Sequence, residues 1–268
     1  MKLQKLYRYV SVRLQTLYRY LRYRLKAGDA RSLKEAFALR FYTEVVQKAC
    51  RDEVPEVIKR RYSDLCSQQV DVPTVEMGAG SRSASPTVAS IARRAGSYGK
   101  RGMLLHNIVE FLRPDNILEL GTSLGLGTSF MGVNNGHRQL ISLEGNPFVC
   151  ALARTTLDFC GVERVEVIEG DFRQTLQPAL EKLKTVDLVF IDGDHQKDPT
   201  LAYFDQILPF LGPESVVVFD DIYWSWEMEQ AWRLIQEHPR VRISLDLFRS
   251  GIVFIDPELP KRHYVLKF

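Results

Sequence analysis

The stretch NILELGTSLGLGTSF, residues 116–130, decides the fold of this 268-residue chain. A short apolar run leads to Glu119, a glycine-rich turn follows, and small residues then open a helix. In α/β proteins, this succession seats a nucleotide-like ligand at the carboxyl end of the first parallel strand. The stretch therefore predicts a parallel sheet and a ligand site at its carboxyl edge.

The alternation of short apolar runs with helix-length intervals continues to residue 219. The runs that predict strands are NILEL (116–120), QLISL (139–143), VEVIE (165–169), DLVFI (187–191) and SVVVF (215–219). The intervals of roughly 15–25 residues accommodate crossover helices, so we expect a mostly parallel sheet with helices on both faces. Beyond them, a helix at 226–237 precedes two runs, 242–248 and 252–255, whose short connection requires an antiparallel hairpin. Residues 263–268 predict a last edge strand.

The first 28 residues form a basic arm. They hold eight Lys and Arg residues and no acid, and subtracting those charges from the net +3 leaves −5 for the remainder. This distribution is not that of a nucleic-acid-binding domain, and we expect no nucleic-acid partner. Apolar residues at steps of three and four predict an amphipathic helix over 2–26. They are Leu3, Tyr7, Val10, Leu14, Leu17 and Leu21. Two alternatives stay open: the helix packs on its own body or on a second subunit in a homodimer, or it lies peripherally on an anionic membrane.

Three segments are expected along the chain: an N-terminal helical extension (1–70), a linker or lid loop (71–86) rich in small residues, and an α/β domain (87–268). The extension holds a helical region at 32–68, which Pro55 breaks or restarts.

The cysteines and the hydropathy indicate a cellular location. Four scattered cysteines lack a metal-binding spacing and favour free thiols in a reducing cytoplasm. No transmembrane run or signal peptide is predicted, so we expect a cytoplasmic protein, with peripheral membrane contact as the open alternative.

The glycine turn discriminates between cofactors. Its glycines follow the spacing GxxxGxG, whereas a dinucleotide fold carries GxGxxG. They are Gly121, Gly125 and Gly127. Thr122 and Ser123 add backbone and hydroxyl groups, and Glu119 would oppose a pyrophosphate but suits a cationic ligand. S-adenosylmethionine carries a sulfonium and an α-amino group and no phosphate, so the charges favour it over NAD.

Acids follow all five strands. Glu144 ends the second strand in LEGNP, where a carboxylate can accept both ribose hydroxyl protons. Asp171 follows the third, where it could bind an adenine amine while Phe172 covers the base. Asp192 follows the fourth strand, and the pair 220–221 follows the fifth. One such acid could simply cap the next helix, but five in succession favour a ligand-binding edge.

The ordered motifs ELGTSLG, SLEGNP, EGDF, VDLVFIDGDH and VVFDD resemble those of class I S-adenosylmethionine-dependent methyltransferases. The resemblance covers roughly 110–255 and is greatest to O-methyltransferases of the catechol and caffeoyl-CoA type and to the related bacterial family with a DGDH motif. It implies a Rossmann-like, seven-stranded sheet with an antiparallel C-terminal hairpin, and a small-molecule methyl acceptor bearing a hydroxyl. The implied cofactor-binding residues are Glu119, Gly121, Thr122, Ser123, Gly125, Glu144, Gly145, Asn146, Gly170, Asp171, Phe172 and Asp192.

The resemblance also implies catalytic and metal-binding residues. Asp192, Asp220 and Asp221 would hold a divalent cation such as Mg²⁺, and Asp192 and His195 would be catalytic. Asp221 stands where the relatives have Asn, and His195 stands where they have a Lys base, so metal use stays open. His titrates near neutrality and can act as a general base, although it could also merely begin a helix.

Two other functions remain open on the same residues. One is an aminopropyltransferase-like enzyme, which also uses acidic strand ends. The other is a non-catalytic cofactor-binding module that docks membranes or partners through residues 1–28. The aromatic residues Tyr223, Trp224 and Trp226 form either a wall of the acceptor pocket or ordinary helix packing.

Overall fold

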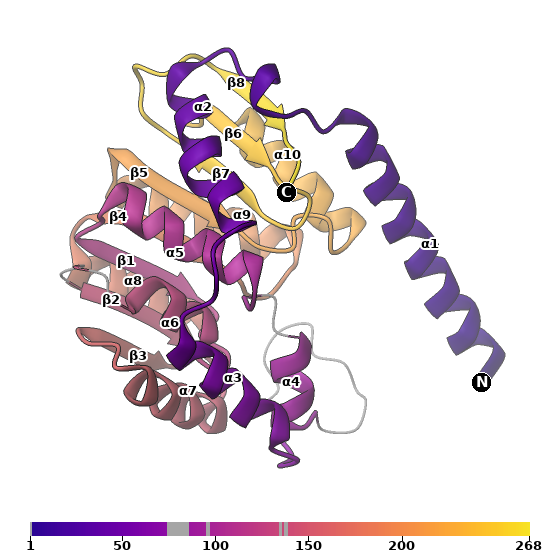
Figure 1. Ribbon diagram of the computed structural model, residues 1–268, viewed down its shortest axis with the longest axis vertical. Coiled ribbons are helices and arrows are strands. Elements are labelled where there is room, and N and C mark those ends of the chain that lie inside the picture. Colours follow the sequence, from indigo (N-terminus) through magenta and orange to yellow (C-terminus); the bar gives the residue numbers. More distant parts are fainter. Residues whose placement is uncertain (1, 74–85, 95–96, 134–135, 137–138) are drawn as a thin grey trace.

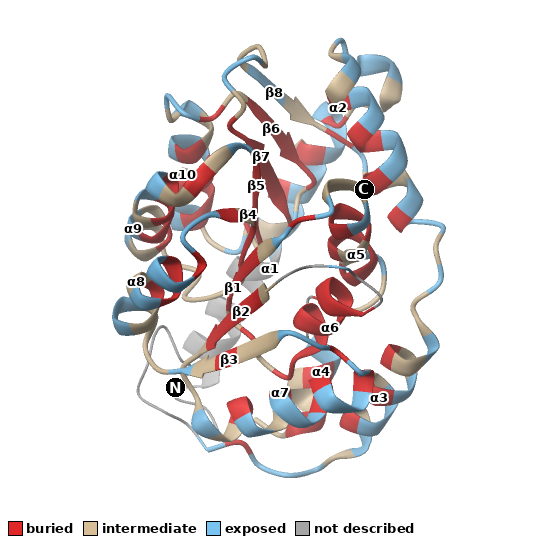
Figure 2. Ribbon diagram, turned by 90° about the vertical axis from the view of Figure 1, so that its left-hand side faces the viewer, coloured by how far each residue is buried: buried red, intermediate tan, exposed pale blue. Residues whose placement is uncertain are grey.

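A computed structural model describes the backbone of residues 2–73, 86–94, 97–133, 136 and 139–268, and the side chains of these residues from Leu14 onward. An eight-stranded sheet lies between two layers of helices (Figures 1 and 2). The strands are β1 (Asn116–Leu120), β2 (Gln139–Glu144), β3 (Val165–Glu169), β4 (Val186–Ile191), β5 (Leu211–Phe219), β6 (Ile243–Asp246), β7 (Gly251–Phe254) and β8 (Arg262–Val265). The α-helices are α1 (Lys2–Lys26), α2 (Ala36–Phe41), α3 (Glu56–Ser67), α4 (Val88–Arg94), α5 (Lys100–Leu112), α6 (Leu126–Gly132), α7 (Pro147–Cys160), α8 (Phe172–Leu183), α9 (Lys197–Ile207) and α10 (Trp226–Glu237). Short 3₁₀ turns occur at Ala30–Ser32 and Leu208–Phe210, and a π-helical turn at Tyr42–Gln47 extends α2.

The strand order is β3-β2-β1-β4-β5-β7-β6-β8. The first five strands are parallel, β7 runs antiparallel to both of its neighbours, and β8 pairs in parallel with β6. The predicted fold class is confirmed, with eight strands in place of seven. The additional strand is β8, the edge strand expected near 263–268.

The order of the strands reverses between β1 and β4, which lie side by side although 65 residues separate their ends. In open α/β sheets, ligands bind at such a reversal, outside the carboxyl ends of the strands. The amide of Asp192 donates to the carbonyl of Leu120 at 2.8 Å and thereby fixes the turn after β4 beside the turn after β1.

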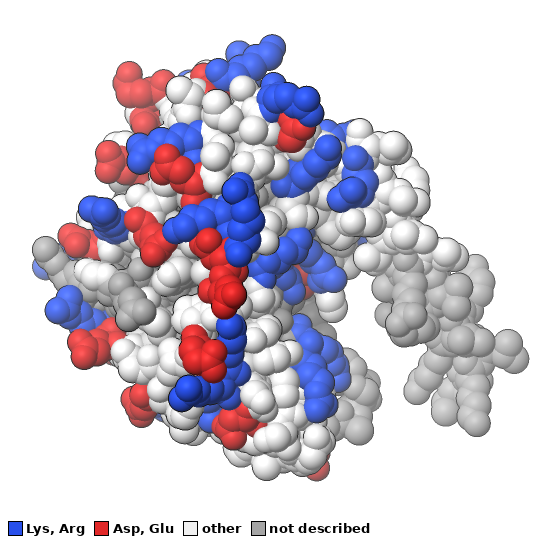
Figure 3. Space-filling model, viewed as in Figure 1, with Lys and Arg blue, Asp and Glu red and all other residues white. Residues whose placement is uncertain are grey.

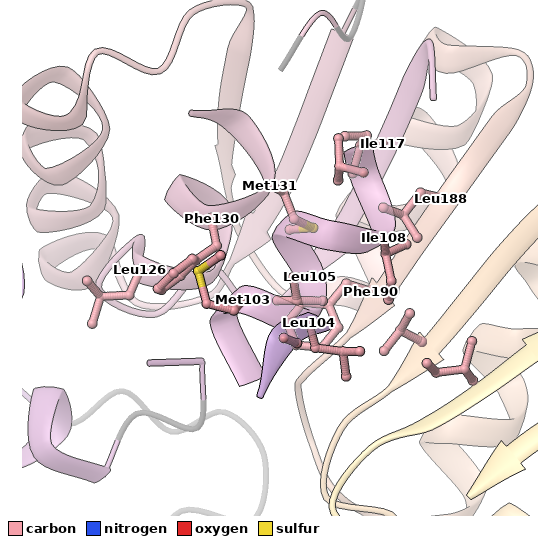
Figure 4. Packing of buried hydrophobic residues seen from close by; sticks show 14 of the residues in the cluster. Met103, Leu104, Leu105, Ile108, Ile117, Leu126, Phe130, Met131, Leu188 and Phe190 are labelled. Carbon is pink, nitrogen blue, oxygen red and sulfur yellow. The ribbon is translucent and has the colours of Figure 1, made fainter. Parts of the chain in front are cut away.

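The two faces of the sheet bury separate hydrophobic clusters. Helices α8, α9 and α10 cover one face, and α5, α6 and α7 cover the other together with α2 and α3 (Figure 2). On the second face, Met103 and Ile108 of α5 and Phe130 of α6 pack toward Phe190 of β4 (Figure 4). Burial of one such side chain contributes about 1.5–3 kcal/mol, so these layers hold the strand ends in a fixed register.

The N-terminal helices α2 and α3 share this second cluster. The Phe41 ring lies edge-on to Phe254 of β7 at 4.9 Å between centroids and is fully buried. Pro55 stands at the N-cap position of α3, as its predicted role in restarting a helix requires. The predicted boundary near residue 70 stays a prediction, although the helices before it pack on the sheet rather than around a core of their own.

Helix α1 projects from the body in Figure 1 and contacts it through its C-terminal part. Arg19 and Arg22 bind Glu229 of α10, and the Tyr23 hydroxyl donates to the carbonyl of Leu266 at 2.5 Å. Leu17 and Leu21 of the predicted apolar face are instead more than half exposed. The helix therefore packs on its own body, as one of the two alternatives expected, but its described part does so through Arg19 and Tyr23 rather than through the predicted apolar face.

Two observations bear on the location that the sequence predicts. Among the helices that the structure describes, none combines the length and apolarity needed to cross a bilayer. The four cysteines are free thiols, with Cys150 and Cys160 buried. The cytoplasmic location stays a prediction.

Candidate active site

A cavity of about 730 Å³ opens at the carboxyl edge of the sheet. Its lining comes from the turns after the first four strands: Gly121 and Ser123 after β1, then 144–146, 170–173 and 192–194. The first two turns of α9 close the remaining wall. The cavity therefore lies where the reversal of strand order predicts a ligand.

Nine of the twelve predicted cofactor-binding residues line this cavity. They are Gly121, Ser123, Glu144, Gly145, Asn146, Gly170, Asp171, Phe172 and Asp192. Glu119 and Thr122 line a smaller adjoining cavity that also borders Asp192. Gly125 borders neither cavity: it has φ +79° at the N-cap of α6, and a β-carbon there would lie 3.0 Å from the carbonyl oxygen of Ala153. The structure gives Gly125 a part in α6–α7 packing.

Glu144 is positioned by the backbone around it. Its two carboxylate oxygens accept one amide each, from Ser123 and Asn146, both at 2.9 Å. Asn146 in turn caps α7 by accepting from Phe148 N, so the start of that helix fixes the turn. Burial raises the pKa of Glu144, while these amides oppose the shift. An ionised carboxylate has lone pairs left for further donors, as binding of two ribose hydroxyls requires.

Glu119 is fully buried beneath the same edge. One carboxylate oxygen accepts from Thr128 and Ser142, both at 2.5 Å, and the other has no hydrogen-bond partner among the described residues. Burial raises the pKa of Glu119 to about 7. A buried oxygen without a donor is costly, and a cationic ligand group would supply what the protein does not. The side chain therefore fits an amine- or sulfonium-bearing cofactor.

We expect Glu119→Gln to flatten the dependence of stability on pH. The folded-state pKa lies above the unfolded value, so the stabilisation due to Glu119 is present below the unfolded pKa and is lost as pH rises through about 7. Over that range, the wild type should lose roughly 3 kcal/mol of unfolding free energy relative to the variant. Urea titrations of both proteins at several pH values measure this difference. A constant difference would contradict a protonated Glu119 at acidic pH.

The predicted catalytic pair is brought together. The Nε2 atom of His195 lies 3.6 Å from a carboxylate oxygen of Asp192, and both side chains are partly exposed. Burial raises the pKa of Asp192 well above its usual range, and the nearby carboxylates of Asp220 and Asp221 raise it further. His195 has φ +42°, a left-handed conformation that is unusual for a residue with a side chain and that occurs often at functional sites.

The predicted metal ligands have protein partners. Asp220 accepts from Arg101 at 3.3 Å and from Ser250 at 3.2 Å, and Asp221 accepts from Arg249 at 2.9 Å. Within the part of the chain that the structure describes, no group of three His, Cys, Asp or Glu side chains is arranged to hold a metal ion. In this arrangement the residues do not fit the predicted metal site, because Arg101 and Arg249 already bind two of its three carboxylates.

The third strand end also has a structural role. Asp171 caps α8 by accepting from Arg173 N at 2.9 Å, and the Arg173 guanidinium lowers the pKa of Asp171. The Phe172 ring lies against Gly193, where a β-carbon would approach it to 2.4 Å. Asp171 is therefore both a helix cap and a cavity residue, and the two interpretations of the strand-end acids do not exclude each other.

Sequence reasoning missed the wall formed by α9. Pro199, Ala202 and Tyr203 line the cavity, and the Tyr203 hydroxyl donates to Asp194 at 2.5 Å. These three positions repeat at helical spacing directly after the DGDH motif, which could have revealed them. Arg101 carried no comparable signal, because it lies on a helix outside the motifs.

The predicted lid and the aromatic residues after β5 lie near the cavity in part. Residues 77–85 of the predicted lid lie outside the described residues, but its two ends are held together, with Val72 N donating to Pro86 O at 2.8 Å. Asn146 donates to the carbonyl of Pro73 at 2.8 Å, which ties the loop to the cavity. Trp224 is 59% exposed, with its ring 6.0 Å from His195, whereas Tyr223 packs on Phe248.

Comparisons with known proteins show which proteins this chain resembles. A family model described as a methyltransferase domain matches residues 118–222. Catechol O-methyltransferase B of Danio rerio is 36% identical over 104 residues, which cover 37% of this chain and 38% of the relative. A catechol O-methyltransferase of Niastella koreensis is 32% identical over 127 residues, covering 46% and 56%. The match thus spans about half or less of the length of these curated relatives.

Solved structures show the same fold. A Podospora anserina methyltransferase with bound S-adenosylhomocysteine has a TM-score of 0.59 and 20% identity, covering 83% of this chain and 97% of that chain. An O-methyltransferase of Bacillus cereus, also in complex with S-adenosylhomocysteine, has a TM-score of 0.54 and 20% identity, covering 78% and 96%.

The strand order and the ligand cavity at its reversal define a class I methyltransferase fold. Residues 118–222 match the family model described as a methyltransferase domain. The resemblance to O-methyltransferases of the catechol and caffeoyl-CoA type, drawn from the motifs, is confirmed.

Proposed function

We propose that the protein transfers a methyl group from S-adenosylmethionine to a hydroxyl of a small molecule. The observation that carries this proposal is the meeting of Glu119, Glu144 and Asp192 around two adjoining cavities at the carboxyl edge of the sheet, with a buried oxygen of Glu119 that lacks a donor among the described residues. These acids suit the amine, sulfonium and ribose of that cofactor, and a pyrophosphate would be repelled there.

Each side chain has a proposed role. Bound S-adenosylmethionine supplies an activated methyl group. Glu144 accepts the ribose hydroxyls, Phe172 covers the adenine, and Glu119 stabilises the positive charge. Asp192 and His195 then take the proton that the acceptor hydroxyl loses, and the raised pKa of Asp192 brings that carboxyl closer to the pH at which a general base operates.

We propose no resident metal in this reaction. Arg101 and Arg249 already provide positive charge to Asp220 and Asp221. An acceptor hydroxyl would therefore be oriented by His195 and the exposed Trp224 beside it.

Calorimetric titration with S-adenosylhomocysteine tests the proposed cofactor site. We expect binding by the wild type and a weakening of about 10- to 100-fold in Glu144→Gln, because charge-assisted hydrogen bonds contribute more than neutral ones. Glu166→Gln is a matched control, since Glu166 is a partly exposed acid of β3 that binds Lys182 and does not line the cavity. The control should bind like the wild type. Absence of binding at millimolar ligand in the wild type would refute the proposal.

The alternatives differ in their products. An aminopropyl transfer would leave methylthioadenosine, whereas methyl transfer leaves S-adenosylhomocysteine. A non-catalytic module would bind the ligand and release neither product with any acceptor. Product analysis by mass spectrometry therefore separates all three functions.

A further inference from the structure

The described part of α1 presents an apolar stripe that faces away from the body. Leu14, Leu17, Tyr18, Leu21 and Leu25 are 52–89% exposed. At 3.6 residues per turn, these five positions fall within about 100° of the helix circumference. They account for five of the twelve large hydrophobic side chains that are exposed among the described residues. In Figure 3, the described part of α1 accordingly shows a mostly uncharged surface.

The opposite face of α1 holds the helix on the body. Arg19 and Tyr23 are only 7% and 4% exposed, and the buried carboxylate of Glu229 binds Arg19, Arg22 and Arg233. Burial would raise the pKa of Glu229, but the arginines lower it below its usual value, so the carboxylate stays ionised. The orientation of the stripe is therefore fixed by buried contacts.

The attachment of α1 reaches the acceptor side of the candidate site. The rings of Tyr20 and Tyr23 contact Phe248 at 5.1 and 5.2 Å, and Phe248 stacks on Tyr223 at 5.3 Å. The next residue, Arg249, binds Asp221. A surface that covers the stripe would thus hold the carboxyl edge of the sheet in a defined orientation.

Charge indicates what covers the stripe. The first 28 residues carry eight basic residues and no acid; Arg24 is exposed at the edge of the stripe, and Lys26 is exposed farther around the helix. Pairing with the α1 helix of a second copy would bring the six basic residues that Glu229 does not bind against six more, without acids on either helix for ion pairs. An anionic lipid surface instead offers an apolar phase for the leucines and opposite charge for the flanking basic residues.

We propose that α1 lies along an anionic lipid surface with Leu14, Leu17, Tyr18, Leu21 and Leu25 inserted. The inference concerns binding and does not depend on methyl transfer. A helix with an outward apolar face and a basic border binds the interface without crossing it.

Vesicle co-sedimentation of the full chain tests this inference. We expect binding to phosphatidylcholine vesicles that contain phosphatidylglycerol, weaker binding to phosphatidylcholine alone, and loss of binding as salt increases. The triple variant Leu17→Gln/Leu21→Gln/Leu25→Gln should bind at least about tenfold more weakly. Its melting temperature and affinity for S-adenosylhomocysteine should stay unchanged, because the three side chains are exposed.

Two further variants complete the experiment. Leu39→Gln/Leu234→Gln replaces exposed leucines outside α1 and should bind vesicles like the wild type. Arg24→Gln/Lys26→Gln should weaken binding to the anionic vesicles alone. The inference is overturned if the wild type does not bind anionic vesicles, or if the triple variant binds them as tightly as the wild type does. So does a wild-type dimer that the triple variant converts to a monomer, since the stripe would then be covered by a second copy.

Discussion

Asp192→Asn is expected to lower kcat by about 10²- to 10⁴-fold, the range that positioned general acid–base groups contribute. Asn keeps the shape of the side chain, so the cavity should persist and S-adenosylhomocysteine should bind with an affinity within about tenfold of the wild type. The loss arises because an amide can neither accept the proton of the acceptor nor stabilise a protonated His195 across the 3.6 Å contact.

The same substitution is expected to raise the melting temperature. Burial and the carboxylates of Asp220 and Asp221 raise the pKa of Asp192, so the ionised form is less favourable in the folded protein than in the unfolded chain. The stabilisation due to the protonated carboxyl is lost as pH rises through the folded-state pKa, and Asn avoids that loss. A variant that is more stable and much less active is typical of a residue retained for function.

Asp198→Asn is the matched control, because Asp198 also lines the cavity but belongs to α9. It should keep kcat within about threefold of the wild type. Assays across pH should show wild-type kcat falling as pH decreases through the raised pKa of Asp192, since only the ionised carboxylate accepts a proton. An unchanged kcat in Asp192→Asn would exclude Asp192 as a catalytic residue.

Addition of EDTA to the same assays tests whether Arg101 and Arg249, rather than a metal ion, bind Asp220 and Asp221 in the active enzyme. Because Arg101 and Arg249 bind Asp220 and Asp221, activity should persist in the chelator. Loss of activity that Mg²⁺ restores would show that the carboxylates release the arginines and bind metal after all.

Local patterns in the sequence were sufficient to predict the sheet and most of the residues that line the cavity. The strand ends at Glu144 and Asp192 follow runs whose apolar character and spacing require buried parallel strands, so their position at one edge follows from topology. The hairpin at 243–254 was predictable because its short turn permits only an antiparallel return.

Features that depend on contacts between distant segments could not be predicted in this way. Arg101 reaches Asp220 across 119 residues, and no spacing relates a helix outside the motifs to a strand end. Residues 2–26 were correctly predicted as an amphipathic helix, but the pattern gives only the existence of an apolar face. Whether that face points inward depends on buried contacts such as that between Arg19 and Glu229, 210 residues apart.

Gly121→Ala is expected to be the most destabilising of the glycine substitutions at the cavity, lowering the unfolding free energy by about 3–5 kcal/mol. Gly121 has φ +103°, and a β-carbon there would lie 2.1 Å from the carbonyl oxygen of Asp192. That oxygen belongs to the backbone after β4, so it cannot rotate away as the end of a flexible side chain would. Relief of the clash requires the turns after β1 and β4 to separate, and binding of S-adenosylhomocysteine should be lost with it.

Two control variants divide this effect into its causes. Gly161 has φ +67° with open space around its missing β-carbon, so Gly161→Ala measures the left-handed conformation alone, about 1 kcal/mol. Gly212 does not have a positive φ, and a β-carbon there would lie 3.9 Å from Ser215 Oγ, an ordinary contact. Gly212→Ala therefore measures a glycine substitution with neither constraint. Denaturant titrations of the three variants give the comparison. The excess of Gly121→Ala over Gly161→Ala reports the close approach of the β1 turn to the end of β4, and an excess near zero would contradict the packing that forms the floor of the cavity.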